Sequence, residues 1–223
     1  MSHYHTITIC GWGQKPDGLA NIAPDAHMLS YANSESLEAW LASLEPMECD
    51  TLIGWSQGGQ LALKAISEGI IKAKKLVLLA VPYQFVSSSG IKCGMNNQQF
   101  VSFKYAFMAE PERTLKRFSL MMSHNDLHQK EVFNGVQSDR EQIEKWDYWL
   151  ELLGEFTAQE IDFSNIPEKM LLVHGADDVV VESSQTSVFM PFMPHAQVEI
   201  WDKCAHAPHL HDAVRLKQLI EAM

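Results

Sequence analysis

Residues 51–59 read Thr51-Leu52-Ile53-Gly54-Trp55-Ser56-Gln57-Gly58-Gly59, and this stretch decides the fold class of the chain. Its apolar start, residues 51–53, predicts a short strand, and residues 61–66 beyond the glycines favour a helix. Between them lies a Gly-x-Ser-x-Gly motif, whose glycines let the neighbouring backbone pass close to a sharp turn. Such a turn lifts the hydroxyl of Ser56 to the edge of a sheet, so Ser56 is a candidate nucleophile. The alternative interpretation is an ordinary glycine-rich turn.

Strands and helices alternate along the rest of the chain. Further short apolar or β-branched runs predict strands at residues 5–10, 28–31, 76–80, 170–173 and 198–201. The runs 76–80 and 170–173 contain no polar residue, which is typical of strands buried on both faces. Apolar residues at helical spacing predict helices at 37–44 and 213–220. This alternation predicts an α/β fold with a mostly parallel central sheet flanked by helices.

The middle of the chain has a different character. From Tyr83 to Phe163 the sequence contains no convincing strand. Amphipathic segments at residues 100–108, 112–122 and 143–153 predict helices instead. Because this segment lies between two buried strands, we interpret it as a helical cap, or lid, over the carboxyl-terminal edge of the sheet. The expected division is a core of residues 1–83 and 163–223 with a lid of residues 84–162.

Composition excludes several classes of protein. The chain has 223 residues, of which 46% are apolar and 20% charged, so it can bury a substantial core. Its net charge of −11 disfavours nucleic acid as a partner. The longest apolar run, residues 76–81, is too short to cross a membrane, and the first residues do not resemble a secretory signal. Four scattered cysteines predict neither a disulfide scaffold nor a zinc site, and we expect a cytoplasmic protein.

A nucleophilic serine needs a histidine base and an orienting acid, which follow it in the order Ser, Asp, His in such a fold. Asp178 comes shortly after the strand 170–173, and the spacing Gly-x-x-Asp from Gly175 favours it over Asp177. Asp177 is interpreted as a carboxylate that caps a turn. His206 follows the strand 198–201 in the same way. Both motifs lie just beyond strand ends, the edge at which α/β sheets place their sites.

Other residues near His206 admit competing interpretations. His206, His209 and His211 could together indicate zinc, but neither a carboxylate cluster nor an HExxH pattern accompanies them. His209 and His211 are therefore interpreted as loop and helix-start residues. Cys204 is interpreted as a structural thiol, because no helix start follows it that could bind an oxyanion. We expect no metal and no cofactor.

The segment Gly11-Trp12-Gly13 follows the first predicted strand. The backbone N–H groups of Trp12 and Gln57 are the expected oxyanion donors, because both would point at the carbonyl attacked by Ser56. The side chains of Trp12 and Trp55 are candidate apolar walls of a substrate site. Ordinary core packing is the alternative for each.

Together these motifs resemble those of the α/β-hydrolases, and specifically the pimeloyl-[acyl-carrier protein] methyl ester esterases of biotin synthesis. The similarity extends to the predicted lid, through residues 90–92, 112–118, 148–153 and 162–167, and covers most of the chain. It implies a catalytic triad of Ser56, Asp178 and His206, and a lid wall including Phe118 and Met122 that lines the acyl chain. It also implies release of methanol from the methyl ester. Cys10 stands where many relatives have histidine, and the amino-terminal part is short.

Lid arginines grip the acidic carrier protein in this family, and Arg113, Arg117 and Lys130 lie at comparable places. The charge pattern gives independent support, because residues 113–130 contain four basic residues and one acidic residue, Asp126. A solvated helix surface is the alternative. The expected partner is thus an acyl-carrier protein, with no nucleic acid and no membrane, and we expect a monomer.

Three other functions remain open at this point. The same triad would serve a general short-chain carboxylesterase or a thioesterase. A carbon–carbon bond hydrolase of the same fold would need further polar groups in its pocket. A non-catalytic ligand-binding member is disfavoured, because all three triad residues are present.

Overall fold

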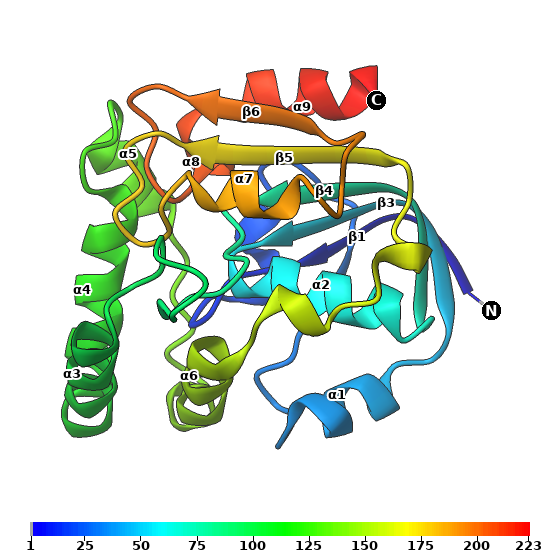
Figure 1. Cartoon of the computed structure of the whole chain (residues 1–223). Helices are drawn as coiled ribbons and strands as arrows, with labels where there is room; N and C mark the ends of the chain where they lie inside the picture. Colours follow the sequence, from blue (N-terminus) through cyan, green and yellow to red (C-terminus); the bar gives the residue numbers. More distant parts are fainter. Residues whose placement is uncertain (1) are drawn as a thin grey trace.

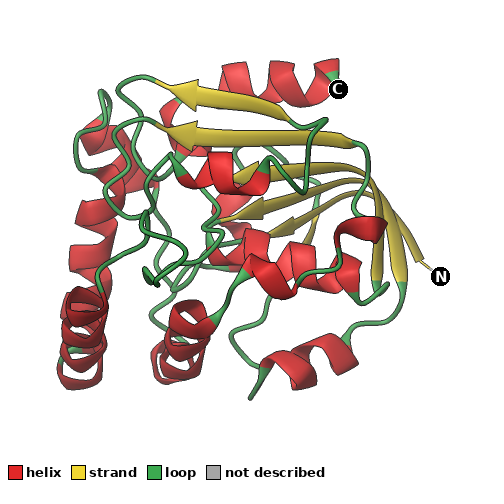
Figure 2. Cartoon of the chain, in the orientation of Figure 1, coloured by secondary structure: helices red, strands yellow, loops and turns green. Residues whose placement is uncertain are grey.

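One parallel sheet organises residues 2–223, which are the residues that the computed structural model describes (Figures 1 and 2). Its six strands are β1 (Ser2–Ile9), β2 (His27–Leu29), β3 (Met47–Trp55), β4 (Ile71–Leu79), β5 (Lys169–Gly175) and β6 (Gln197–Trp201). They are ordered β2-β1-β3-β4-β5-β6, and every neighbouring pair is parallel. The predicted α/β fold with a mostly parallel sheet is confirmed.

The centre of the sheet is buried towards the carboxyl ends of its strands. In the pairing of β3 with β4, Leu52 lies opposite Leu76 and Gly54 opposite Leu78. All four residues are buried, whereas Lys72, near the start of β4, is exposed. The apolar core therefore lies directly beneath the edge at which β3, β4 and β5 end.

Helices cover both faces of this sheet. The core contributes α1 (Leu37–Ser43), α2 (Gln57–Ser67), α7 (Gln185–Phe189), α8 (Pro208–His211), α9 (Ala213–Ala222) and the 3-10 helix η1 (Pro16–Leu19). In Figure 1, α2 and α9 lie on opposite sides of the sheet. Helix α2 begins directly after Ser56 and contains residues 61–66, for which the sequence predicted a helix. No helix within residues 2–223 is long and apolar enough to cross a membrane.

Residues 80–168, all of which the structure describes, contain helices and no strand. These are α3 (Asn97–Ala109), α4 (Pro111–Ser123), α5 (Gln129–Gly135), α6 (Trp146–Glu155) and the 3-10 helices η2 (Ile143–Lys145), η3 (Ala158–Glu160) and η4 (Phe163–Asn165). Figure 1 shows α3, α4 and α5 beyond the arrowheads of β5 and β6, at the carboxyl edge of the sheet. The assignment of residues 84–162 as a separate lid stays a prediction.

Candidate active site

Ser56 lies in the turn between β3 and α2 with an unusual backbone conformation. Its φ is 53° and its ψ is −126°, a region that costs an L-residue about 1–3 kcal/mol. Two hydrogen bonds hold the turn. The Ser56 N–H donates to the carbonyl of Leu79 at 2.8 Å, and the Gly59 N–H donates to the carbonyl of Ser56 at 2.9 Å. The turn is thus the sharp strand-to-helix connection that the motif predicted.

Three glycines make this turn possible because backbone passes very close to each. A Cβ on Gly54 would lie 2.5 Å from the Cα of Gly59, and one on Gly58 would lie 2.2 Å from the carbonyl oxygen of Ile9. A Cβ on Gly59 would lie 2.1 Å from the Cγ2 of Val81. Real Cβ atoms do not approach other atoms so closely. The glycines therefore serve the packing of α2 onto the sheet, which a loose glycine-rich turn would not need.

Asp178 and His206 are in direct contact. The Nδ1 of His206 lies 2.7 Å from the Oδ2 of Asp178, and both side chains are fully buried. The other oxygen, Oδ1, accepts the backbone N–H groups of Val180 at 2.8 Å and Val181 at 3.0 Å. A carboxylate in this position holds the proton on Nδ1 and leaves Nε2 as the basic atom. Asp177 lies half-buried beside it, and its N–H donates to the carbonyl of Cys204.

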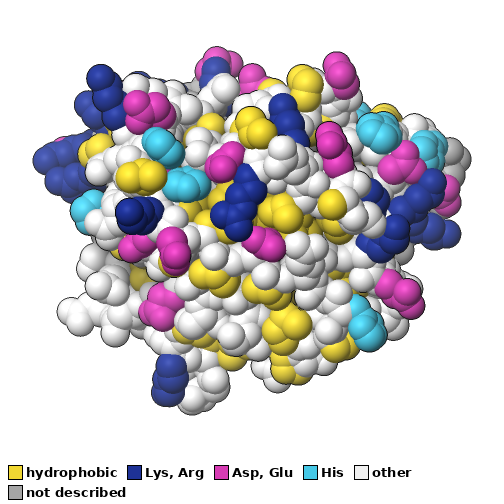
Figure 3. Space-filling view, turned by 90° about the horizontal axis from the view of Figure 1, so that it is seen from above, with side chains coloured by type: hydrophobic (Ala, Val, Ile, Leu, Met, Phe, Trp, Pro, Cys, Tyr) yellow, Lys and Arg dark blue, Asp and Glu magenta, His cyan; other side chains and the backbone are white. Residues whose placement is uncertain are grey.

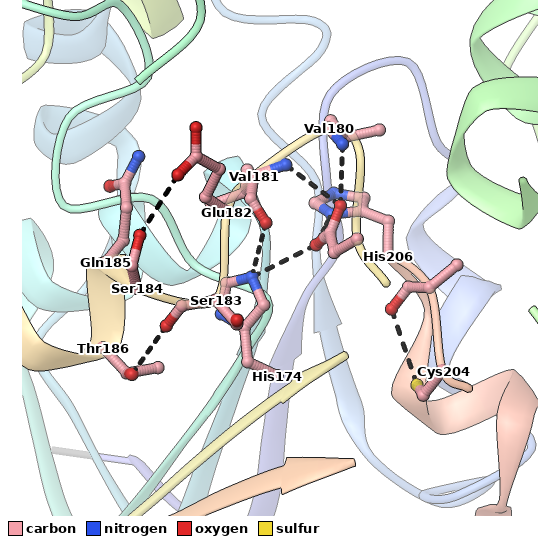
Figure 4. Close-up of polar contacts among 12 residues, drawn as sticks. His174, Val180, Val181, Glu182, Ser183, Ser184, Gln185, Thr186, Cys204 and His206 are labelled. Carbon is pink, nitrogen blue, oxygen red and sulfur yellow. Dashed lines mark hydrogen bonds and ion pairs between the residues drawn. The ribbon is translucent and has the colours of Figure 1, made fainter. Parts of the chain in front are cut away.

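His174 is a fourth group at this carboxylate, and sequence analysis missed it. Its Nε2 lies 3.1 Å from the Oδ2 of Asp178 and 2.8 Å from the carbonyl oxygen of Val181 (Figure 4). Because a carbonyl only accepts, Nε2 of His174 carries a proton. The one available signal was a histidine inside an apolar strand, four residues before the predicted acid.

The carboxylate of Asp178 is held ionised by these neighbours. Burial alone would raise the pKa of Asp178. The charges and hydrogen bonds of His206 and His174 lower this pKa by more than burial raises it, so the pKa lies well below its ordinary value. Asp178 therefore carries its negative charge throughout the physiological pH range. That charge stabilises a protonated imidazole at His206.

The backbone of His206 is anchored on both sides. Its N–H donates to the carbonyl of Met122 at 3.1 Å, and its own carbonyl accepts the Nε1–H of Trp55 at 2.9 Å. Because Trp55 directly precedes Ser56, its indole links the serine turn to the histidine loop. Within residues 2–223, the buried Nε2 of His206 has no hydrogen-bond partner. Ser56, Asp178 and His206 thus follow β3, β5 and β6 at one edge of the sheet, while their catalytic roles stay predictions.

The predicted oxyanion donors flank Ser56. Gln57 is the first residue of α2, so its N–H has no acceptor within the helix and lies at the positive end of the helix dipole. A Cβ on Gly11 would lie 3.1 Å from the Cβ of Ser56 and 3.7 Å from its Oγ, so the segment carrying Trp12 passes directly beside the hydroxyl. Both backbone segments therefore lie beside Ser56, and the role of their N–H groups as oxyanion donors stays a prediction.

The side chain and the carbonyl of Cys10 both hold the segment that carries Trp12. Its Sγ donates to the carbonyl of Pro16 at 3.3 Å, and its own carbonyl accepts the hydroxyl of Tyr31 at 3.2 Å. Burial raises the pKa of the Cys10 thiol to about 12, so it remains protonated and able to donate. The same Tyr31 hydroxyl also lies 3.3 Å from the side-chain oxygen of Gln57.

Trp12 lies at the centre of an aromatic cluster between the sheet and the helices of residues 84–162. Its ring meets Phe107, Phe118, Phe103 and Trp146 edge-on, with centroids separated by 5.0, 5.3, 5.7 and 6.4 Å. Its Nε1–H donates to the carbonyl of Trp146 at 2.8 Å. Trp12 and Phe118 therefore pack against each other in one apolar cluster, and their contact with substrate stays a prediction.

The other two predicted substrate contacts are also buried. Met122 is 1% exposed, and its carbonyl accepts from His206. The ring of Trp55 is 1% exposed and packs edge-on against His209, with centroids 4.4 Å apart. The contacts of Trp55 are thus those of core packing beneath His206, and a contact of Trp55 with substrate stays a prediction.

A cavity of about 430 Å³ lies beside this cluster. Its lining includes Phe103, Met121, Val180, Glu182, Asn96 and Gln99. Phe103 contacts Trp12, and Val180 binds the carboxylate of Asp178 through its N–H. The cavity therefore lies between the aromatic cluster and the loop that carries the acid.

The predicted carrier-protein contacts lie on the surface of α4 and α5. Arg113, Arg117 and Lys130 are all exposed. Arg113 forms an ion pair with Glu110 at 2.8 Å, which neutralises part of its charge. In Figure 3, Lys and Arg side chains gather at both ends of the face shown, and the left-hand end is the one at which α3 to α5 lie in Figure 1.

Comparison with known proteins agrees with this architecture. A family model described as the alpha/beta hydrolase family matches residues 3–218. A protein named pimeloyl-[acyl-carrier protein] methyl ester esterase from Aromatoleum aromaticum is 25% identical over 246 residues, covering 99% of this chain and 98% of that protein. The similarity thus extends over the full length of both chains.

Solved structures show the same fold. An esterase from Exiguobacterium antarcticum superposes with a TM-score of 0.74 at 15% identity, covering 100% of this chain and 92% of that one. A bromoperoxidase from Bacillus anthracis gives 0.73 at 14% identity, covering 98% and 91%. Because these two proteins have different names, the fold alone does not define the reaction.

Proposed function

The chain belongs to the alpha/beta hydrolase family, and from this premise we propose that it is a serine carboxylesterase. We propose further that it hydrolyses the methyl ester of pimeloyl-[acyl-carrier protein] in biotin synthesis, since the relative from Aromatoleum aromaticum that bears this name matches the whole chain. The observation that carries the esterase proposal is the 2.7 Å contact between Asp178 and the Nδ1 of His206, which leaves Nε2 free.

In the proposed reaction, Nε2 of His206 takes the proton of the Ser56 hydroxyl while the serine oxygen attacks the ester carbonyl. Asp178 stabilises the resulting imidazolium through Nδ1. The N–H groups of Trp12 and Gln57 bind the negatively charged oxygen of the tetrahedral intermediate. Methanol leaves with the proton from Nε2, and the acyl group remains on Ser56.

The second half of the reaction repeats these roles with water. His206 takes a proton from water, whose oxygen attacks the acyl-enzyme, and the serine oxygen leaves with that proton. The product carries a free carboxylate. The aromatic cluster around Trp12, with Phe118 and Met122, would contact the acyl chain, while Arg117, Lys130 and Arg113 would meet the acidic carrier.

Replacing Ser56 tests the esterase proposal directly. We expect Ser56→Ala to abolish hydrolysis of short-chain p-nitrophenyl esters, because loss of the nucleophile from a triad costs about 10⁶ in kcat. The matched control is Ser102→Ala on the exposed face of α3. Full activity in Ser56→Ala, or failure of a serine-directed phosphonate to label Ser56 in the wild type, would refute the proposal.

The substrate is tested separately. One carrier-bound acyl chain bearing both a methyl ester and the carrier thioester allows the two cleavages to be compared in the same reaction. We expect release of methanol without release of the carrier; preferential thioester cleavage would identify a thioesterase. In addition, the gene should restore growth without biotin to a strain that lacks its methyl esterase, and the Ser56→Ala gene should not.

A further inference from the structure

Asp126 carries a buried carboxylate that the proposed reaction does not use. Its side chain is fully buried in the turn between α4 and α5. The Oδ2 atom accepts the backbone N–H of Ala205 at 2.9 Å. The Oδ1 atom accepts the backbone N–H of His128 at 2.8 Å and lies 2.9 Å from the Nδ1 of His211. A buried charge requires such partners, and here two of the three come from the loop and helix around His206.

Backbone hydrogen bonds join the same two segments. The N–H of His206 donates to the carbonyl of Met122, and the N–H of Leu127 donates to the carbonyl of Lys203 at 2.8 Å. Residues 122–128 thus pack along one side of the loop of residues 203–206 and are hydrogen-bonded to it. Lys203 itself has a φ of 57°, a conformation that a residue other than glycine adopts only when its surroundings hold it there.

The opposite side of the histidine loop is equally constrained. The N–H of Asp177 donates to the carbonyl of Cys204 at 3.0 Å. A Cβ on Gly175 would lie 2.2 Å from the carbonyl oxygens of both Cys204 and Ala205. The loop is therefore held between the acid-bearing turn after β5 and residues 122–128. Release of either side would let the His206 backbone move.

We propose that Asp126 is a positioning residue for His206, and this inference rests on the proposed function. Ala205 directly precedes His206, so the bond from its N–H to Oδ2 fixes the peptide from which the imidazole projects. Without a charged acceptor, the buried N–H of Ala205 loses its strongest partner and the loop relaxes. The Nε2 atom then points away from the Ser56 hydroxyl for part of the time, and proton transfer slows.

A cation site is the competing explanation of this cluster. Ligand atoms of Asp126, Cys204 and His211 lie within 4.8 Å of one another. However, both oxygens of Asp126 already accept N–H groups. Burial also raises the pKa of the Cys204 thiol far above its ordinary value, which disfavours the thiolate that a metal would need. Zinc retained by the wild-type protein would support a cation site instead of the positioning role.

The first experiment compares Asp126→Asn with the wild type on a soluble p-nitrophenyl ester. The concentration of competent active sites is measured by phosphonate labelling, and kcat is calculated per labelled site. Misfolded protein therefore does not lower the value of kcat. We expect kcat per labelled site to fall about 10- to 100-fold, as for other small misplacements of a reacting group, with KM changed less than about twofold. The control is Asp162→Asn, which makes the same change at the exposed start of η4.

The second measurement does not depend on catalysis. Hydrogen exchange of the backbone N–H groups of Ala205 and His206 is followed in the resting protein. We expect exchange at least about tenfold faster in Asp126→Asn and unchanged in Asp162→Asn, because only the first change removes the charged acceptor of the Ala205 N–H, whereas Asp162 accepts the N–H of Ser164. If Asp126→Asn does not fold, His211→Leu serves instead. It removes one of the three donors, so a smaller acceleration, about two- to fivefold, is expected there.

The outcomes separate the two proposals. Unchanged kcat and unchanged exchange in Asp126→Asn would overturn the positioning role. So would stoichiometric zinc that the wild type retains and Asp126→Asn loses. If the wild type hydrolyses no ester and the phosphonate leaves Ser56 unlabelled, the proposed function fails, and exchange at Ala205 and His206 still decides whether Asp126 holds the loop.

Discussion

At two adjacent strand ends the backbone takes positive φ values without glycine, 53° at Ser56 and 48° at Ala80. Each conformation costs about 1–3 kcal/mol in isolation. Hydrogen bonds to neighbouring strands offset this cost, since Ser56 donates to the carbonyl of Leu79 and Ala80 donates to the carbonyl of Val173 at 2.9 Å. Two of the four described residues other than glycine with positive φ thus lie where β3 and β4 end, which is the edge occupied by the candidate site.

The acid of the triad can be identified by a pair of isosteric changes. We expect Asp178→Asn to lower kcat by about 10³–10⁴-fold, because an amide can donate to Nδ1 of His206 and so stabilise the wrong tautomer. Asp177→Asn, next to it in the chain, should leave kcat within about twofold. Steady-state kinetics on a soluble ester distinguish the two residues, and the reverse ranking would assign the role to Asp177.

His209 should make the protein sensitive to acid. Burial, and next the charge of His206, lower the pKa of His209 to about 3, and neither ring nitrogen has a hydrogen-bond partner within residues 2–223. Between pH 6.5 and pH 3 the unfolded chain therefore binds a proton that the folded chain does not. The free energy of unfolding should fall by up to about 1.4 kcal/mol per pH unit as the pH decreases through this range.

Substitution of His209 by phenylalanine tests this linkage. The ring already packs edge-on against Trp55 and forms no hydrogen bond within the described chain, so His209→Phe keeps the packing and removes the titrating group. Urea unfolding at pH 7, 5.5 and 4.5 should show a shallower loss of stability in the variant. An identical pH dependence in both proteins would contradict the assignment.

Local motifs predicted part of the candidate site and missed the rest. The contact between Asp178 and His206 follows from the spacing of each residue from its strand. His174 was missed because its apolar neighbours in β5 indicate only a buried strand, and its approach to Asp178 depends on how the next turn folds back. Asp126 lies 79 residues before Ala205 in the chain, so no local pattern could connect them.

At the scale of elements, patterns located the centres of strands and helices better than their ends. β3 and β4 begin at Met47 and Ile71, several residues before the apolar runs that predicted them. Their first halves carry exposed residues such as Glu48 and Lys72, so the signal was limited to the buried halves. Helix α5, with seven residues, was not predicted, because so short a segment contains too few turns to show a helical period.

The contact between α2 and the turn after β4 leaves no space for a methyl group. We expect Gly59→Ala to destabilise the protein by about 1–3 kcal/mol, because its Cβ would lie 2.1 Å from the Cγ2 of Val81. Val81→Ala removes that atom. In urea unfolding, the double variant should therefore be less destabilised than the sum of the two single variants. Strict additivity would show that the two residues do not compete for the same space.

At the scale of the whole molecule, a net charge of −11 makes the placement of basic residues decisive for an acidic partner. Arg117 and Lys130 are exposed on α4 and α5, whereas Arg113 is paired with Glu110. At the opposite end of the strands, Lys74 is paired with Asp50. Attraction of a carrier protein would therefore depend on the unpaired basic groups near the candidate site.

Charge reversal at this surface should affect only the carrier-bound substrate. We expect Arg117→Glu with Lys130→Glu to raise KM for a carrier-bound ester about tenfold at low salt, less at high salt, and not for a soluble ester. The control is Lys72→Glu with Lys217→Glu, two exposed lysines outside α4 and α5. Each pair of substitutions lowers the net charge of the protein by 4. Equal effects of the two pairs would contradict a local docking surface.

The packing around Trp12 also makes the protein suitable for optical measurement. All six tryptophans are nearly inaccessible to solvent, so the folded chain should emit at short wavelength when its indoles are excited. Trp12, in the segment beside Ser56, donates a hydrogen bond to Trp146, which belongs to the helices that follow β4. Separation of these two parts of the chain would hydrate both indoles and move the emission to longer wavelength. Opening of the candidate site could therefore be timed by stopped-flow fluorescence without an added dye.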